Sequence, residues 1–535
     1  MSTIAFARLG DLFAPLEQLL ASGGDTRLRL DPAARLNFYG CRPYPRPEAF
    51  TFASSTATSI SERAFAEAEA ARADLVRAAL RHGLEPAFDA RVEALRAELL
   101  ALLGLSGSGT EIVFSPSGTD SELHAVFVAR ALLGTPMTSI IAAADETGSG
   151  VASASCGRHF NTLTAQGVAV AKGDPIAGLA EGVASLGLPL RATGRPRPPD
   201  EMDEAVLRAV AETVASGRNV LLHVMDHSKL GAQCPSRAVL EEIARRWDGA
   251  VQVVIDACQM RLGRSRLAWH LAQGHLVQIT GSKFFTGPPF SGALLVPQPL
   301  ARRLREAAGF PSGLGDYTQR SDWPPAWPGI RAGLVERANL GPLLRWIAAA
   351  REMRDYFAVP LAFRRAALQR FAAVVPDLIA AEPALALLPE EPRASAGADE
   401  EMAAPTIFPF LVRRAGRALA PAPCGVLYRA LNADVSAVLP ATLPDAERRL
   451  ALQPCHIGQP VPIAEPGGGT VAALRISAGA RVVSESWSTA GEAESMATLD
   501  GEFAQIRAIL GKLALLLRHF DAVERAFATT QVAAA

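Results

Sequence analysis

Lysine is the residue that this sequence most nearly lacks. Among its 535 residues are 53 Lys and Arg together, yet Lys occurs only at 172, 229, 283 and 512, so nearly every cation is Arg. An amine can act as a nucleophile and form a Schiff base at neutral pH, whereas a guanidinium cannot. Each Lys is therefore considered individually, and we expect Lys172 and Lys512 to be ordinary surface residues.

The sequence also lacks an excess of one charge, a CxxC pair and a long apolar segment. The formal net charge is −1, which gives no basic surface for nucleic acid, so we expect no nucleic-acid partner. The six scattered cysteines are typical of reduced thiols in a cytoplasmic protein. Arg8 and Asp11 interrupt the apolar N-terminus, and no segment of about 18 or more apolar residues occurs. We expect a soluble, cytoplasmic protein with no membrane partner.

The apolar residues are arranged in a pattern that indicates a fold class. Residues 61–103 predict two amphipathic helices that break at Gly83–Pro86. From about residue 110, short apolar segments alternate with helices, which predicts an α/β fold with a mainly parallel sheet covered on both faces. We expect the strands at 111–115, 138–144, 163–171, 220–225, 251–256, 275–280 and 292–297, and a surface loop at 187–201.

The rest of the chain predicts a second, smaller domain. A helical zone at 334–380 is followed by a mixture of strands and helices over 404–535, which closes with a helix near 499–526. We therefore divide the chain into an N-terminal segment with helices (1–104), a large α/β domain (105–330), and a linking helix with a small C-terminal α+β domain (331–535).

Polar residues follow several of the predicted strands. The sequence SPSGTDSE (115–122) leads from a strand into a helix, where a phosphate could bind at Gly118 and Thr119; an ordinary helix cap explains the same residues. Asp256 follows an apolar strand directly, and such a carboxylate needs a cation or a strong donor, whether from a ligand or from a structural partner. Lys283 also follows a buried strand, either as a desolvated nucleophile or as a lysine at the edge of a loop.

Together these three features indicate a cofactor. An anion cradle, an acidic residue for a ring nitrogen and a lysine for a Schiff base are what pyridoxal 5'-phosphate requires. The stretch from about 105 to 300, with residues near 475, resembles the fold-type I pyridoxal-phosphate enzymes, and most closely the class V aminotransferase and cysteine desulfurase branch.

The resemblance implies roles for individual residues. Ser282 stands where that branch commonly has His, Ser228 or His227 in MDHSKLG would face the cofactor, and Thr147 in AADETGSG stands where the branch stacks an aromatic residue or His on the ring. The remaining implied contacts are Gly118, Thr119 and Asp120 to the phosphate, Thr280 and Ser282 as further phosphate donors, Asp256 to the ring nitrogen, Gln259 near the phenolic oxygen, and Lys283 as the Schiff-base lysine.

The resemblance also implies a substrate and an activity. LRISAGAR (474–481) resembles the motif whose Arg, here Arg475, binds the substrate's α-carboxylate. We expect an enzyme that forms a Schiff base with a small amino-acid-like substrate, in the first place an aminotransferase. A C–S lyase or cysteine desulfurase is the alternative, but Cys455 looks like part of a strand entering the core rather than a mobile nucleophile. A non-catalytic regulator that retained the fold is the second alternative.

The last expectations concern the surroundings of the site. The resemblance implies a homodimer, for which 312–329 is the candidate crossing segment. The Pro-rich stretch 37–62 is expected to border the pocket, although a plain connecting loop would have the same composition. Lys229 is expected to be a loop neighbour of the site, and no spacing of His, Cys or acidic residues predicts a metal site.

Overall fold

A seven-stranded sheet forms the large domain of the computed structural model, which describes residues 9–191, 195–307, 309–390, 401–465 and 468–528. The strand order is β2-β8-β7-β6-β5-β3-β4, and every neighbouring pair is parallel except the two that β8 makes. The strands are β2 (Glu111–Ser115), β3 (Met137–Ala142), β4 (Val183–Leu188), β5 (Asn219–Met225), β6 (Val251–Asp256), β7 (Leu276–Thr280) and β8 (Gly292–Val296).

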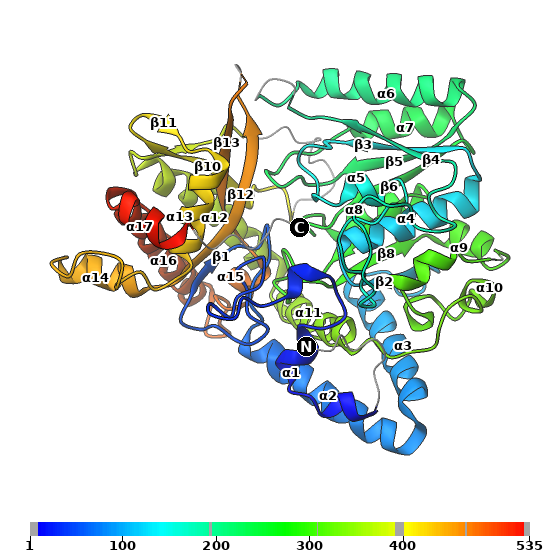
Figure 1. The fold of residues 1–535 in the computed structure, drawn as a ribbon, viewed down its shortest axis with the longest axis horizontal. Helices are drawn as coiled ribbons and strands as arrows, with labels where there is room; N and C mark the ends of the chain where they lie inside the picture. The colour runs from blue at the N-terminus through cyan, green and yellow to red at the C-terminus, as the bar shows by residue number, and fades with distance from the viewer. Residues whose placement is uncertain (1–8, 192–194, 308, 391–400, 466–467, 529–535) are drawn as a thin grey trace.

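Helices cover both faces of this sheet (Figure 1). Alternate residues of β6 point to opposite faces: Val254 packs in the cluster that contains the apolar residues of α4, while Val253 and Ile255 pack in the cluster that contains those of α6 to α8. The α/β class with a mainly parallel sheet is therefore confirmed. The helices are α4 (Gly118–Leu133), α5 (Val151–Ala154), α6 (Pro199–Ala215), α7 (Arg237–Arg246), α8 (Arg264–Ala272), α9 (Gln298–Leu304) and α10 (Pro328–Arg331).

A second sheet combines strands from both ends of the chain. β1 (Phe50–Phe52) pairs in parallel with β12, so that Phe50 lies opposite Cys455, and the other pairs of this sheet are antiparallel. The N-terminal segment is thus part of the C-terminal domain's sheet. The other strands are β9 (Leu385–Leu387), β10 (Ile407–Arg414), β11 (Arg417–Ala418), β12 (Cys455–Ala464) and β13 (Thr470–Ser477); the helices beside them are α13 (Pro421–Leu431), α14 (Asp445–Leu452), α15 (Ala480–Ser484), α16 (Glu492–Arg518) and α17 (Phe520–Phe527).

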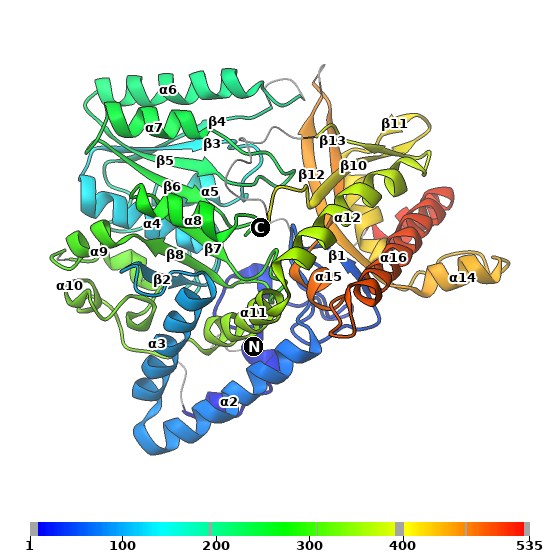
Figure 2. The same cartoon turned by 180° about the vertical axis from the view of Figure 1, so that it is seen from behind.

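Long helices connect the two sheets. α2 (Glu62–His82) and α3 (Leu84–Leu102) meet at Gly83, whose φ of 87° ends the first helix, so the predicted break is confirmed. α11 (Leu340–Ala358) packs against both of them and against α1 (Leu16–Leu20) and α15, and it leads into α12 (Leu361–Ala380). Figure 2 shows α11 at the centre, between the large sheet and the C-terminal domain. No helix within the described ranges has the length and apolar character needed to cross a membrane.

Two sequence expectations about the large domain were wrong. Residues 163–171 form no strand: Leu163 and Ala169 make only an isolated bridge around a turn at Gly167, whose φ is 80°. The strand that follows β3 in the chain and pairs with it in parallel is instead β4. Its end overlaps the loop expected at 187–201. β4 is an edge strand with mostly exposed side chains, including Leu186 at 41% exposure, so it lacks the apolar pattern of its buried neighbours.

Lys512 is a further correction, because it is not a surface residue. Its side chain is fully buried, and its ammonium donates hydrogen bonds to the carbonyl oxygens of Ala433 at 2.6 Å and Gln453 at 2.5 Å. Burial lowers its pKa to about 8. Lys512 therefore joins the segments around α13 and α14 to α16, while Lys172 is exposed as expected.

The predicted crossing segment packs largely within its own chain. Trp323 and Trp327 are fully buried beside Phe127 and Phe310, and the Trp327 indole donates to the carbonyl oxygen of Ala301 at 3.0 Å. The homodimer, the role of 312–329 at its interface and the domain boundaries after 104 and 330 stay predictions.

Candidate functional site

A cavity of about 310 Å³ opens at the carboxyl ends of β6 and β7 and at the N-terminus of α4. Ligands bind at this edge of open parallel sheets, where loops and helix N-termini meet. The opposite wall comes from the N-terminal segment (38–39 and 55–57) and from β12 and β13. The expectation that 37–62 borders the pocket is therefore confirmed. Among the residues that line the cavity are seven of the predicted ones: Gly118, Thr119, Asp256, Thr280, Ser282, Lys283 and Arg475.

The N-terminus of α4 forms one end of the cavity. Ser117 is the helix cap, and its hydroxyl accepts from the Asp120 backbone N–H at 3.3 Å. A Cβ on Gly118 would lie 2.7 Å from the Cys258 sulfur, so any larger residue here would require the Cys258 side chain to shift. The hydroxyls of Thr119 and Ser282 also line the cavity, and neither makes a hydrogen bond within the described residues. Free N–H groups, a helix dipole and open hydroxyls together suit a phosphate.

Asp256 lies at the end of β6 on the same cavity wall. Its Oδ1 accepts from the Cys258 backbone N–H at 3.1 Å, and the Cys258 thiol interacts with the same carboxylate. The backbone bond fixes the carboxylate, which lines the cavity and can accept from a donor inside it. A protonated ring nitrogen is such a donor.

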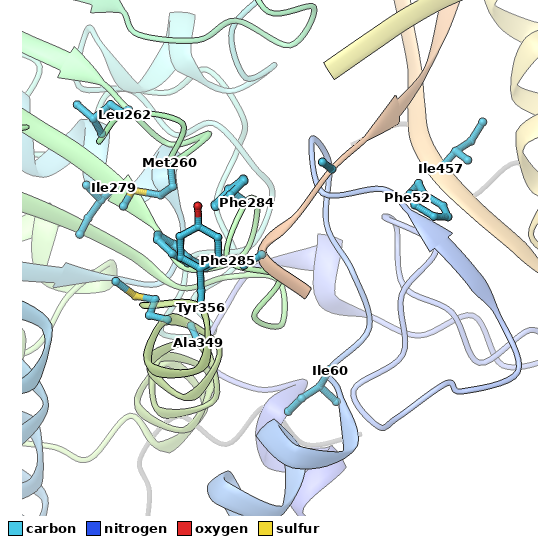
Figure 3. Close-up of a cluster of buried hydrophobic side chains, with 14 of the residues drawn as sticks. Phe52, Ile60, Met260, Leu262, Ile279, Phe284, Phe285, Ala349, Tyr356 and Ile457 are labelled. Atoms are coloured by element: carbon cyan, nitrogen blue, oxygen red, sulfur yellow. The ribbon is translucent and has the colours of Figure 1, made fainter. Parts of the chain in front are cut away.

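Lys283 follows β7, and the two aromatic residues directly after it fix the position of its backbone. Phe284 and Phe285 are 0% and 3% exposed, and their rings lie 5.3 and 5.8 Å from that of Tyr356 on α11. Figure 3 shows these three rings in one cluster with Ala349. The loop then turns at Thr286, whose φ is 56°. Because the aromatic pair is anchored in the core, the preceding Lys283 faces the cavity, where its side chain is only partly buried.

Four predicted cofactor residues lie behind the cavity wall. The Asp120 carboxylate accepts a hydrogen bond from the Ser117 hydroxyl, and the Ser228 hydroxyl bonds to the Glu146 carboxylate. Asp120, Thr147, Ser228 and Gln259 are all buried, and none of them lines the 310 Å³ cavity.

Gln259 and Thr147 are placed away from the cavity for different reasons. The Gln259 amide donates to the Ser55 carbonyl at 3.1 Å and accepts from Arg261 at 2.6 Å, so it joins the N-terminal segment to the large domain. Thr147 lines a second, smaller cavity, and its hydroxyl has no hydrogen-bond partner among the residues that the structure describes. The described residues of the 143–150 loop place Gly148 and Ser149 on the main cavity, so this loop brings no ring to it.

Burial and the nearby Asp25 raise the pKa of Asp120 to about 7. The unfolded chain releases this proton near pH 4 and the folded chain near pH 7, so this contribution to stability is lost as the pH rises between them. Asp120→Asn keeps a neutral group, and we expect its melting temperature to exceed that of the wild type by about 2 °C or more at pH 8. No gain is expected at pH 4, which thermal unfolding at both values tests. The exposed Asp174→Asn is the control, and an equal gain at both pH values would contradict the assignment.

Several cavity residues were not anticipated from the sequence. Arg27 donates to Asp25 at 2.6 Å, and its guanidinium lies 4.8 Å from the centre of the Phe290 ring. Tyr39 lies on the same side of the cavity, with its ring 6.3 Å from that of Phe290. Arg is common in this chain and the first 60 residues have no periodic pattern, so nothing in the sequence distinguished these positions. Lys229, expected only as a neighbour, lines the cavity itself.

The cysteines bear on the possible chemistry. Cys455 begins β12 and is 1% exposed, which confirms the expectation that it enters the core, and burial raises its pKa to about 11. Cys258 lines the cavity, but burial and the neighbouring Asp256 raise the pKa of its thiol well above the ordinary value. Because a raised pKa keeps a thiol protonated, neither of these cysteines is set up to act as a thiolate nucleophile. Within the described residues, no cluster of three His, Cys, Asp or Glu side chains could hold a metal ion.

No family model matches the chain, and no curated protein matches its sequence. Among solved structures, mouse CSAD is similar at 15% identity over 86% of this chain and 83% of that one, with a TM-score of 0.44. Catharanthus roseus tryptophan decarboxylase, in complex with L-tryptophan, is similar at 14% identity over 86% and 82%, with a TM-score of 0.45. At these values the likenesses carry no argument about activity.

Proposed function

We propose that this chain is a pyridoxal 5'-phosphate-dependent enzyme that acts on a small amino-acid-like substrate. The observation that carries the proposal is the position of Lys283 and Asp256 on one cavity wall, at the ends of the neighbouring strands β7 and β6, with an anion cradle at the N-terminus of α4. The residues of the cavity fit the group: a glycine at which a Cβ would crowd Cys258, two hydroxyls without a described partner, and a carboxylate that lines the cavity.

Each residue has a distinct part in the proposed reaction. The cofactor, when bound, supplies an aldehyde that bonds to amino groups and a ring that stabilises negative charge at the substrate's Cα. Thr119, Ser282 and the first N–H groups of α4 would hold its phosphate, and the Asp256 carboxylate would accept from its ring nitrogen. Lys283 would hold the cofactor through its amino group, and the same amine would be the base for the substrate's Cα proton.

Transamination is the specific reaction that we propose. A desulfurase needs a thiolate, and burial raises the pKa of both Cys455 and Cys258. The C–S lyase and the non-catalytic regulator are the remaining alternatives from the sequence.

The test is a spectral titration of the purified protein, first with pyridoxal 5'-phosphate and then with L-amino acids. We expect a visible absorbance band on cofactor addition, a change in that band with at least one amino acid, and keto-acid-dependent amine transfer. Release of sulfide, pyruvate or carbon dioxide in place of amine transfer would assign another reaction to the same site. Cofactor binding without turnover on any substrate would support the regulator, and the absence of a band would refute the proposal.

A further inference from the structure

Four cations line the cavity: Arg27, Lys229, Lys283 and Arg475. Among the described lining residues, Asp256 is the one carboxylate. Arg27 is already paired with Asp25, at 2.6 Å, and the proposed function assigns Lys283 to the cofactor. Lys229 and Arg475 are therefore the two cations that could bind the carboxylate of a substrate.

Arg475 is saturated by the protein. Its Nη1 donates to the carbonyl oxygens of Lys229 at 3.1 Å and Ser55 at 3.4 Å, and its Nη2 donates to the Thr56 hydroxyl and the Gln459 carbonyl, both at 2.8 Å. All four terminal N–H groups are thus used, and only the buried Nε has no partner. A guanidinium binds a carboxylate through two parallel N–H groups, and Arg475 does not offer two.

Lys229 is in the opposite situation. Its backbone is fixed, because its N–H donates to the Glu146 carbonyl at 3.3 Å and its own carbonyl accepts from Arg475. Its ammonium, by contrast, makes no hydrogen bond or ion pair with any residue that the structure describes. Burial, with the charges of Arg475 and Lys283, lowers its pKa to about 8. A partly buried cation without an acceptor is unfavourable, and an anion in the cavity would pair with it.

We propose that Lys229 binds the α-carboxylate of the substrate, and that Arg475 is a positioning residue that holds the backbone carrying Lys229. The inference rests on the proposed function, and it gives Arg475 a different role from the one that the sequence resemblance implied. It defines the substrates as α-amino acids that are selected over the amines lacking the carboxylate.

The test compares pairs of probes that differ only in the α-carboxylate: L-alanine with ethylamine, L-serine with ethanolamine, and L-cysteine with cysteamine. Each is titrated into the cofactor-loaded protein, and its affinity is read from the change in the cofactor's absorbance. We expect the wild type to prefer at least one amino acid over its amine. Lys229→Met should weaken binding of that amino acid by about 10- to 100-fold and change binding of the amine by less than about threefold.

Two control variants keep the outcomes distinct. Lys229→Arg retains a cation and should keep most of the preference, while the exposed Lys172→Met should behave as the wild type. A loaded wild type without the preference, or a Lys229→Met variant that retains it, would overturn the inference and leave the proposed function standing. A wild type that binds no cofactor would instead refute the proposed function.

The pH dependence separates positioning by Arg475 from a purely structural role. The charged groups that face Lys229 are Arg475, Lys283, Glu146 and Asp256. The preference for the carboxylate should weaken as the pH rises past the lowered pKa of Lys229, because the ammonium then loses its proton. Arg475→Gln removes one of the nearby positive charges, so the pH at which the preference is lost should move upward in this variant. An unchanged midpoint would contradict the proposed coupling of Arg475 to Lys229.

Discussion

Lys283→Ala is expected to abolish the covalent attachment of pyridoxal 5'-phosphate and to lower turnover by at least about a thousandfold. Lys283 lines the cavity, and no described residue holds its ammonium, whereas alanine offers no amine for the aldehyde. Borohydride reduction of the loaded protein followed by peptide mass spectrometry measures the attachment directly. The wild type should carry the cofactor on the peptide containing residue 283, and the variant should carry none.

Two controls make this result specific to Lys283. Lys172→Ala removes an exposed lysine and should change neither attachment nor turnover. Ethylamine added to Lys283→Ala should restore part of the turnover, since a free amine can accept the Cα proton in place of the missing side chain. Full turnover of Lys283→Ala without added amine would refute the proposed mechanism. Attachment at Lys229 in the wild type would exchange the roles of the two cavity lysines.

Arg345→Met is expected to lower the free energy of unfolding by about 3–5 kcal/mol. The fully buried Arg345 donates to the Phe290 carbonyl at 2.6 Å and also to three carbonyls at 20, 22 and 23. Burial lowers its pKa to about 9. Methionine has a similar length but no donor, so four carbonyl oxygens, two buried and two partly buried, would lose their hydrogen bonds.

A matched control lies on the same helix. Arg351 is half-buried and pairs with Asp355 one turn away at 3.0 Å, so Arg351→Met should cost about 0.5 kcal/mol or less. Chemical unfolding of both variants, followed by fluorescence, measures the difference. Equal losses for the two would show that Arg345 does not join the N-terminal segment to α11 as the structure indicates.

The sequence predicted the elements whose residues carry a local pattern. The largely apolar strands at 220–225 and 251–256 and the helix break at Gly83 were placed correctly, because burial on both faces and helix termination leave local signals. The edge strand β4 was missed since its side chains are mostly exposed. The pairing of β1 with β12 joins Phe50 to Cys455, and no local pattern encodes a contact across so many residues.

The sequence also predicted some residues of the candidate site and missed others. Glycine, aspartate and lysine at or within three residues of strand ends were informative because strand ends meet at one edge of the sheet. Gln259 was misplaced, since its amide is bound by Arg261 and Ser55 rather than open to the cavity. The sequence did not show that the protein binds the ammonium of Lys512 and leaves that of Lys229 without a described partner. The difference lies in whether carbonyl oxygens from distant segments reach the ammonium, which only the fold determines.

The pairing of β1 with β12 also constrains when the cavity can form during synthesis. Residues 38–39 and 55–57 of its wall leave the ribosome early, but β1, which lies between them, finds its partner strand only after residue 455 has been made. Until then Arg345 can bind its carbonyls, but the opposite wall at Gln459 and Arg475 does not exist. Contacts between such distant residues form slowly. The cofactor cavity is therefore completed only when nearly the whole chain is available, and the nascent large domain must remain soluble without it.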